Sequence, residues 1–300
     1  NTVYINDPWD TKAIDTVGAG DDVLIVGSGL TAVDKIVELE GKGHKASIYV
    51  LSRHGLFPNR HTKNFQRRSQ VEFSCSSALS ALERIRQRAA NPTATKKVTD
   101  WRQVIDELRP VTQKWWLSLP LPEQKRFLRH LQTYWDIHRH RMASEIADKI
   151  EATREKGKLK IIAGRIISVR AEGDRLTVDV RERGKETSRS IRVSKIINCT
   201  GPQSSLAKVD SPLLANLETR GLIHSHVLGT GIAVRPDGQV VNRMGQPVPG
   251  LFAIGPLLKT ELMESVAVPE LRGQALSLAT KIASLAKAMD CPDASALERA

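Results

Sequence analysis

The fold of this chain is decided by the stretch Asp22-Val23-Leu24-Ile25-Val26-Gly27-Ser28-Gly29-Leu30-Thr31-Ala32-Val33-Asp34. An apolar run of strand length is followed by two glycines, Gly27 and Gly29, and then by the small residue Ala32. Apolar residues with helical spacing continue over 36–39. This order of buried strand, glycine-rich turn and helix is typical of a dinucleotide-binding βαβ unit.

Each position of this turn has a physical role in binding a pyrophosphate. Gly27 permits the tight turn, Gly29 lets the main chain approach the phosphates, and Ala32 keeps the helix close to the strand. The helix N-terminus presents backbone N–H groups to the negative charge. The residues predicted to bind the cofactor here are Gly27, Ser28, Gly29, Leu30, Thr31 and Ala32. A tight turn between strand and helix that holds no ligand is the alternative.

The end of the next strand indicates which dinucleotide is bound. Residues 46–51 are the predicted second parallel strand, whose C-terminal end lies beside the adenosine ribose. A free 2′-hydroxyl is usually held there by Asp or Glu, whereas this chain has Ser52-Arg53-His54. Arg53 can bind a phosphate through two hydrogen bonds, and Ser52 adds a hydroxyl donor. The sequence therefore favours NADPH over NADH, unless Arg53 is only one more surface arginine of a basic protein.

The composition is that of a folded chain of 300 residues, 40% of them hydrophobic, which suffices for two domains or one large one. No apolar run is long enough to span a bilayer, and the first residues lack the order of a signal peptide. The three cysteines, Cys75, Cys199 and Cys291, are far apart, which fits a reducing compartment and excludes a four-cysteine zinc site. We expect a cytoplasmic protein with no membrane partner.

The net charge of +12 raises the question of nucleic-acid binding. The basic residues are scattered along the chain without a recognised groove-reading motif, and a positive field also attracts dinucleotides. The basic run His138-Arg139-His140-Arg141 does not predict a metal site, because neighbouring and i, i+2 side chains of a helix do not face each other. We expect it to contact cofactor phosphate or a neighbouring domain, and we expect neither a nucleic-acid partner nor a metal.

The regions around the glycine turn are expected to complete the first domain. Residues 1–18 are interpreted as a connector that leads into the central strand. Helical spacing runs from about 60 to 156 and includes one long helix from Pro122 towards Ile150. The aromatic residues of this helical insertion either line a substrate pocket or pack in a core; they are Trp115, Trp116, Tyr134 and Trp135.

After the insertion the period of the sequence changes to that of strands. Short strands separated by turns predict an antiparallel β-meander at about 159–193. The apolar strand that follows ends at Thr200 and Gly201, on the edge where an open α/β sheet binds ligands. The nucleotide domain is therefore predicted to span residues 19–202.

Residues 203–300 are predicted to form a separate part. Residues 232–242 flank Pro236-Asp237-Gly238 and predict a hairpin. An apolar strand over 251–254 ends at Gly255 and Pro256, and a last helix begins near Pro269 and Glu270.

These landmarks resemble those of two-dinucleotide flavoproteins, in which a Rossmann unit for NAD(P)H is inserted into an FAD domain. The landmarks stand in the same order at residues 26–34, at Asn198-Cys199-Thr200-Gly201-Pro202 and at Leu251-Phe252-Ala253-Ile254-Gly255-Pro256. More closely, the chain is similar to FAD/NAD(P)-binding proteins related to FAD-dependent urate hydroxylase and L-aspartate N-monooxygenase. The stretches that carry this resemblance are 7–10, 52–58, 134–141 and 264–272.

The resemblance implies that residues 203–300 are the C-terminal part of an FAD-binding domain. By analogy, Gly255 and Pro256 approach the flavin, and the helix that begins at Pro269 and Glu270 points its positive end at the flavin ring. Lys259, Glu261 and Glu264 lie between these segments and are within reach of a substrate or form surface salt links. The first G-x-G-x-x-G of the family, which holds the ADP half of FAD, is absent here, so we expect the N-terminal FAD segment to be missing.

The resemblance further implies an activity, in which NADPH reduces FAD and the reduced flavin uses O₂ to oxygenate a small polar nitrogenous substrate. The cofactors carry this chemistry, so no catalytic side chain is assigned. Two alternatives stay open: a flavin-dependent NAD(P)H reductase without oxygenation, and a non-catalytic dinucleotide-binding module. The oligomeric state, monomer or homodimer, is also left open.

Overall fold

The computed structural model describes residues 3–62, 71–90, 100–203 and 205–290. The chain forms two compact units. The first unit consists of Asn1–Ser69, Glu83–Glu107 and Arg126–Pro202, and the second of Gln70–Leu82, Leu108–Lys125 and Gln203–Ala300.

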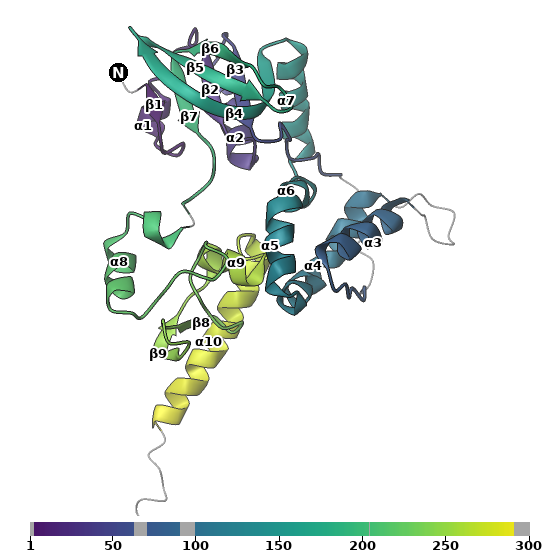
Figure 1. The fold of residues 1–300 in the computed structure, drawn as a ribbon, viewed down its shortest axis with the longest axis vertical. Coiled ribbons are helices and arrows are strands. Elements are labelled where there is room, and N and C mark those ends of the chain that lie inside the picture. Colours follow the sequence, from purple (N-terminus) through teal and green to yellow (C-terminus); the bar gives the residue numbers. More distant parts are fainter. Residues whose placement is uncertain (1–2, 63–70, 91–99, 204, 291–300) are drawn as a thin grey trace, which may run out of the picture. The chain divides into compact units, whose positions relative to one another are not determined.

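A seven-stranded sheet with the order β1-β7-β2-β3-β4-β5-β6 organises the first unit (Figure 1). The strands that pair in parallel are β1 (Tyr4–Ile5), β7 (Lys195–Asn198), β2 (Val23–Val26), β3 (Ile48–Ser52) and residues 159–163 of β4 (Leu159–Glu172). The rest of β4 pairs antiparallel with β5 (Arg175–Glu182), which pairs with β6 (Ser188–Val193). The structure thus confirms the α/β, Rossmann-like fold and shows the meander.

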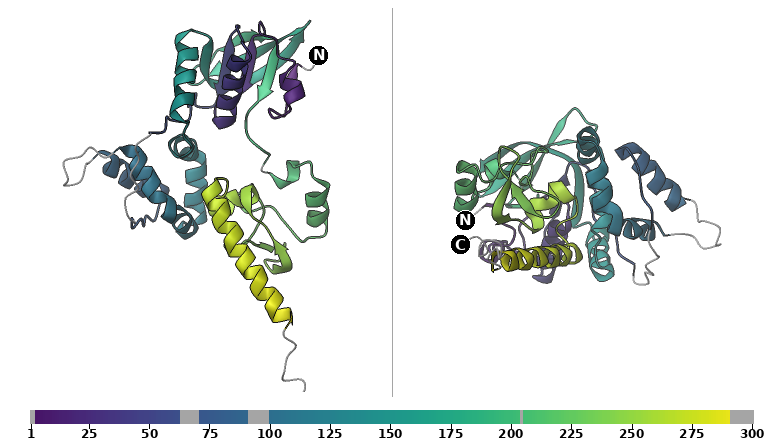
Figure 2. Two further views of the ribbon diagram at one scale, coloured as in Figure 1. Left: turned by 180° about the vertical axis from the view of Figure 1, so that it is seen from behind. Right: turned by 90° about the horizontal axis from the view of Figure 1, so that it is seen from below.

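Alternate residues of the parallel strands face two different layers. Val23 and Ile25 belong to a core cluster with residues of α1 (Thr11–Ile14), α2 (Leu30–Gly41) and α7 (Ser144–Glu155). Leu24, between them, belongs to a second cluster formed with β5 and β6. Figure 2 shows the same arrangement from behind, with α2 and α7 on one face of the sheet. Successive side chains of a strand point to opposite faces of the sheet. The parallel sheet therefore packs against helices on one face and against the meander on the other, which gives three layers.

Residues 1–18 are not merely a connector, and this prediction is corrected. Tyr4 and Ile5 pair in parallel with Ile196 and Ile197, which makes β1 the edge strand of the sheet. Ile14 of α1 is 1% exposed and lies in the core cluster of the helical face. The expected connector is therefore part of the first unit.

The helical insertion contains five helices in the described residues: α3 (Ala78–Ala90), α4 (Trp101–Ser118), α5 (Leu121–His130), α6 (Gln132–Arg139) and α7. The prediction of one long helix from Pro122 is wrong because the backbone pairs elsewhere at its middle. Met142 donates its N–H to the Asn59 carbonyl and accepts from the His61 N–H, each at 2.8 Å, in a short parallel bridge. His140 is extended, and α6 ends there.

The second unit has its own core and collects parts of the insertion as well as the C-terminal residues. Its elements after residue 203 are η1 (Leu206–Lys208), α8 (Pro212–Thr219), β8 (Gln239–Val241), β9 (Pro247–Phe252), η2 (Gly255–Leu258), α9 (Lys259–Leu262) and α10 (Val268–Asp290). The predicted turn at 236–238 is present, but β8 forms its sheet with β9, and Val234 joins Val240 only by an isolated bridge. α10 begins where Pro269 and Glu270 predict a helix start.

Candidate nucleotide-binding site

The glycine turn lies at the C-terminal end of β2, between β3 and β7. The Gly27 N–H donates to the Leu51 carbonyl at 2.8 Å, and the Cys199 N–H donates to the Val26 carbonyl at 2.7 Å. Gly27 has a φ of 106°, and a Cβ placed on it would lie 2.2 Å from the Cys199 carbonyl oxygen. Gly27 is therefore required by the fold itself, because only glycine fits against the end of β7.

Gly29 has a different role, because its backbone conformation is open to any residue. Its φ is −79° and its ψ −169°, and a Cβ placed on it would meet no atom within 4 Å. Gly29 is the N-cap of α2 and provides no side-chain cap. The open space is therefore available to a ligand.

The backbone donors at this helix end are unused. Within the described part of the chain, the N–H groups of five consecutive residues have no hydrogen-bond acceptor; they belong to Ser28, Gly29, Leu30, Thr31 and Ala32. The Ala32 side chain is fully buried in the core, as the close packing of helix on strand requires. Free N–H groups beside open space at a helix N-terminus are what a pyrophosphate needs.

Two serine hydroxyls hold the loop that follows β3. The Ser28 hydroxyl donates to the Leu56 carbonyl at 2.6 Å, so Ser28 can offer a phosphate only its backbone N–H. The Ser52 hydroxyl accepts the Gly55 N–H at 2.9 Å and keeps its own hydrogen for a ligand. These bonds connect the glycine turn to the segment that contains Arg53.

Thr200 and Gly201 border the turn from the β7 side. The Thr200 nitrogen lies 3.1 Å from the position that a Gly27 Cβ would occupy. The Thr200 N–H and hydroxyl both donate to the Asn198 side-chain oxygen, at 3.2 Å and 2.7 Å. Gly201 has a φ of 94° and open space around it. The structure therefore brings the predicted residues of β2, α2 and β7 together at one edge of the sheet.

A basic groove of about 580 Å³ adjoins the end of β3. Its positively charged lining residues are Arg53, Arg129, Arg165, Arg181, Arg183 and Lys185. Arg53 is exposed and forms no ion pair with any residue that the structure describes. This places Arg53 where the sequence predicts the contact to a 2′-phosphate.

Two titratable groups near this edge are held in their neutral forms. The Arg183 guanidinium donates to His54 Nδ1 at 2.8 Å, which requires that nitrogen to be unprotonated. Burial lowers the pKa of His54, and the charges of Arg183 and Arg53 lower it further. Burial raises the pKa of the Cys199 thiol to about 12. Because His54 is neutral, the charge of the groove comes from its arginines. Because the Cys199 thiol stays protonated, Cys199 is a structural residue rather than a nucleophile.

In the second unit, the two predicted flavin segments lie next to each other. Gly255 has a φ of 82°, and a Cβ placed on it would lie 3.6 Å from a methyl group of Leu271 in the first turn of α10. However, the Gly255 N–H already donates to the Gln274 side-chain oxygen at 2.9 Å, and Pro256 has no N–H. The Glu270 carboxylate accepts two hydrogen bonds from Arg109, at 2.5 Å and 2.7 Å, and thus ties α10, whose first turn also holds Pro269, to α4.

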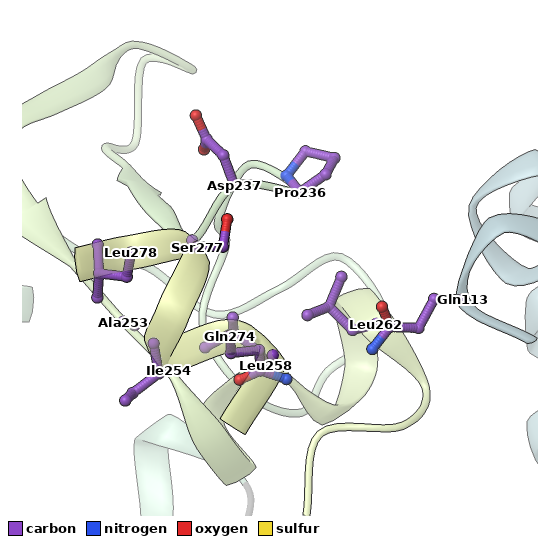
Figure 3. Close-up of a pocket in the computed structure, with 12 residues that line it drawn as sticks. Gln113, Pro236, Asp237, Ala253, Ile254, Leu258, Leu262, Gln274, Ser277 and Leu278 are labelled. Carbon is purple, nitrogen blue, oxygen red and sulfur yellow. The ribbon is translucent and has the colours of Figure 1, made fainter. Parts of the chain in front are cut away.

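A small cavity of about 170 Å³ is lined by Ile254, the residue before Gly255, and lies between the 236–238 turn and α10 (Figure 3). The figure shows Gln274 near Leu258 within the lining. The buried Gln274 Nε2 has no partner among the described residues. The cavity is smaller than the roughly 300 Å³ at which ligand pockets begin, so it does not hold a dinucleotide by itself.

Most of the remaining candidates are structural, and the exception is Tyr134, which is 41% exposed. Trp115, Trp116 and Trp135 are at least nine-tenths buried, and the Trp116 Nε1–H donates to the Thr260 carbonyl at 2.9 Å, so they pack as core residues. His138 meets Trp101 edge to face, and Arg141 binds Asp106 through two 2.6 Å hydrogen bonds. Glu261 binds His226 at 3.0 Å. Among the described residues, no group of three His, Cys, Asp or Glu side chains could hold a metal, and no helix is long and apolar enough to cross a membrane.

Sequence reasoning missed most of the basic groove. Arg165, Arg181 and Arg183 stand in the meander, where the sequence indicates no chemistry. They meet Arg53 only because β4 pairs with β3 on one side and with β5 on the other. Only the pairing register of the meander strands could have shown that these arginines lie together.

The chain matches no protein-family model and no curated protein sequence. Its fold is similar to solved structures of flavoprotein monooxygenases. L-lysine 6-monooxygenase from Pseudomonas syringae is 16% identical with a TM-score of 0.55, and the match covers 92% of this chain and 56% of that one. The reduced form of ornithine hydroxylase from Pseudomonas aeruginosa is 12% identical with a TM-score of 0.54, covering 87% and 52%.

Ornithine N-hydroxylase from Kutzneria sp. 744, solved with reduced FAD, NADP⁺ and L-ornithine, is 13% identical with a TM-score of 0.54, covering 89% and 54%. This chain therefore spans about half the length of the solved structures that it matches. Identities this low show the shared fold, which is the Rossmann-like fold of flavoprotein NAD(P)-binding domains.

Proposed function

We propose that this chain carries the NADPH-binding domain and the C-terminal part of the FAD-binding domain of an FAD- and NADPH-dependent oxidoreductase. Its activity is that of a monooxygenase or hydroxylase acting on a small polar nitrogenous substrate, such as a urate-like or amino-acid-like molecule, with O₂ as co-substrate. The observation that carries the proposal is the set of unused N–H groups from Ser28 to Ala32 beside the open space at Gly29.

The residues at the edge of the first unit fit NADPH. The N–H groups of α2 are placed to bind the pyrophosphate, and Arg53 is placed to bind the 2′-phosphate. Arg53 lies in a groove with an excess of positive charge. No carboxylate stands directly after β3 to bind a free 2′-hydroxyl, and this disfavours NADH. The chain's own contribution is to position the nicotinamide cofactor at the carboxyl edge of its sheet.

The second unit fits FAD at one edge only. Gly255 and the start of α10 adjoin, as the resemblance to two-dinucleotide flavoproteins implies, but the Gly255 N–H is already bound by Gln274. α10 exposes large apolar side chains; Leu276 is 72% and Ile282 48% exposed. The contact between Gly255 and α10 and the exposed apolar face of α10 support a role as part of a larger flavin domain, whereas the engaged Gly255 N–H does not. When bound, the flavin would accept hydride from NADPH and pass the electrons to O₂.

The similarity in fold to ornithine and lysine monooxygenases supports oxygenation of a nitrogenous substrate over simple electron transfer. A flavin-dependent reductase without oxygenation is the second candidate. A measurement of oxygen uptake distinguishes the reductase from the monooxygenase, because a monooxygenase consumes O₂ with stoichiometric oxidation of its substrate. A non-catalytic nucleotide-binding module is the third candidate. It is favoured by the hydrogen bond from the Gly255 N–H to Gln274, which leaves this N–H unavailable to a flavin.

The decisive experiment measures the affinities of NADP⁺ and NAD⁺ for this chain by isothermal titration calorimetry. We expect NADP⁺ to bind at least tenfold more tightly, and Arg53→Ala to remove most of that difference. Arg175→Ala is the matched control, because Arg175 is an exposed arginine at the far end of β5. Equal weakening of both nucleotides by Arg53→Ala would remove the 2′-phosphate role, and no binding of either would remove the proposed function.

The flavin part of the proposal is tested on the full-length protein. Its visible absorption spectrum should show a bound flavin, and NADPH should bleach that spectrum under anaerobic conditions. A colourless full-length protein that still binds NADP⁺ would favour the non-catalytic module.

A further inference from the structure

The basic groove of the first unit contains a pair of arginines that face each other across two strands. Arg165 of β4 is the direct partner of Arg181 of β5 in the antiparallel register. Both side chains are exposed and both line the groove. Like charges directly opposite each other in a sheet are unfavourable, so this pair costs stability unless an anion lies between the two guanidinium groups.

The same strand shows how the chain usually neutralises an arginine. Two residues before Arg181, Asp179 accepts hydrogen bonds from Arg170 at 2.7 Å, from Ser168 at 2.5 Å and from Ser190 at 2.6 Å. No such carboxylate is supplied to Arg165 or Arg181 by any residue that the structure describes. The unneutralised pair is therefore a local exception within the meander.

The carboxylate that lines the groove is already engaged. Glu182 forms ion pairs with Lys185 and Arg189, each at 2.5 Å, which leaves the neighbouring arginines uncompensated. His54 accepts from Arg183 through an unprotonated Nδ1, so the imidazole does not neutralise the arginines. The groove therefore carries an excess of positive charge, which suits the binding of an anion.

The groove lies at the end of β3, the strand next to the one that ends in the glycine turn. Arg53 follows β3, and Arg165 stands two residues after Ala163, the residue of β4 that pairs with Ser52. The Arg183 N–H donates to the Ala163 carbonyl at 2.8 Å, which brings the β5–β6 turn to the same strand end. Three segments far apart in the sequence thus present arginines at the carboxyl edge of the sheet.

We propose that Arg165 and Arg181, together with Arg53 and Arg183, form a site for a dianionic phosphate monoester, which the adenosine 2′-phosphate of NADPH supplies. The assignment of the 2′-phosphate rests on the proposed function, whereas the phosphate site follows from the groove alone. Arg165 and Arg181 are thereby specificity-determining residues that lie in the meander rather than in the loop after β3. Guanidinium groups suit this role because each can donate two parallel hydrogen bonds to a phosphate.

The experiment compares 2′-AMP with 5′-AMP and NADP⁺ with NAD⁺ by calorimetry. We expect 2′-AMP to bind more tightly than 5′-AMP, and Arg165→Ala or Arg181→Ala to weaken 2′-AMP and NADP⁺ at least tenfold while changing NAD⁺ less than twofold. The control is again Arg175→Ala, which should change none of these. The thermal midpoint of the unliganded Arg181→Ala variant should stay equal or rise, because the like-charge pair is relieved; a structural role would lower it.

A second variant separates the two levels of the proposal. Gly29→Val should abolish NADP⁺ binding at the turn but leave 2′-AMP binding to the arginines unchanged. If 2′-AMP binds through these arginines but the wild-type chain does not bind NADP⁺, the phosphate site is supported and belongs to a separate phosphorylated molecule. The same result would refute the proposed function. Unchanged 2′-AMP affinity in both arginine variants would overturn the inference. Tighter binding of a 12-nucleotide single-stranded DNA than of 2′-AMP through the same arginines would also overturn it.

Discussion

The glycine turn after β2 and the glycine turn after β9 differ in the backbone N–H groups that they leave free. At the turn that begins α2, the N–H groups from Ser28 to Ala32 have no acceptor in the described structure. At the turn after β9, the Gly255 N–H donates to Gln274, and the next residue is a proline. A turn that can bind a phosphate is therefore recognised by its run of unused donors, and of these two turns the first has five consecutive ones in the part of the chain that the structure describes.

The helices that follow the two turns differ in the same way. α2 buries Val33, Ile36 and Leu39 in the core of the first unit. α10 exposes Leu276, Ile282 and Leu285, and the core cluster of the second unit is built from residues 206–262. The core of the first unit thus covers the apolar face of α2, whereas the second unit presents an apolar helix face that nothing described in this chain covers.

The largest expected effect concerns Gly27. Gly27→Ala should lower the free energy of unfolding by more than about 3 kcal/mol, because a Cβ at this positive φ meets the Cys199 carbonyl in the backbone of β7. Urea denaturation measures the change. Gly29→Ala is the matched control and should stay within about 1 kcal/mol, the cost of a poor N-cap residue, since its Cβ meets no atom. Equal destabilisation by both substitutions would contradict the separation of roles between the two glycines.

The next effect is on binding rather than on stability. Gly29→Val should weaken NADP⁺ at least 100-fold, or about 2.7 kcal/mol, because the branched side chain fills the space that the pyrophosphate needs. Its effect on unfolding should not exceed about 1 kcal/mol, the usual cost of a poor N-cap residue. Calorimetry with NADP⁺ and denaturation of the same variant check both statements. An unchanged affinity would show that the open space beside Gly29 is not a phosphate site.

The first turn could be predicted from sequence because its determinants are local. The strand, Gly27, Gly29 and Ala32 stand within ten residues, and their spacing alone defines the geometry. Arg53 could be placed for the same reason, directly after the second strand. What the spacing does not contain is the contact between Gly27 and Cys199, which joins residues 172 positions apart.

The parts that were missed depend on pairings between distant segments. The two-residue strand β1 has no periodicity of its own and exists because Tyr4 and Ile5 find β7. The like-charge pair Arg165–Arg181 depends on the register of β4 and β5, which a bulge shifts near Ile167. The break of the predicted long helix depends on the bridge between Met142 and residues 59–61. None of these can be derived from local propensity.

A smaller effect is expected at the second turn. Gly255→Ala should cost about 1–2 kcal/mol, because alanine at a φ of 82° is strained although its Cβ has an ordinary contact with Leu271. NADP⁺ affinity should not change, since the Gly255 turn belongs to the second unit. Denaturation and calorimetry on this variant test the comparison directly. A loss of NADP⁺ binding would show that the two turns act together, contrary to the contrast drawn from their donors.

The smallest effect is electrostatic and belongs to the first unit alone. Hydrogen bonds from Ser168, Ser190 and Arg170 lower the pKa of Asp179 from its ordinary value of 3.8 to about 2. Because the folded-state pKa is below the unfolded one, the stabilisation is complete above pH 4 and disappears as the pH falls through 2. Asp179→Asn should therefore lower the thermal midpoint by only about 1–2 °C at pH 6, as expected for an exposed ion pair.

The pH dependence of this difference identifies its cause. Thermal scans at intervals from pH 6 down to pH 2 should show the midpoints of the wild-type chain and of Asp179→Asn converging at the acid end. Arg170→Gln should show the same convergence with a smaller starting difference, since Ser168 and Ser190 still donate to the carboxylate. A difference that is independent of pH would mean that the asparagine disturbs the packing of the meander. In that case Asp179 could no longer be used as the example of a neutralised arginine with which the Arg165–Arg181 pair is compared.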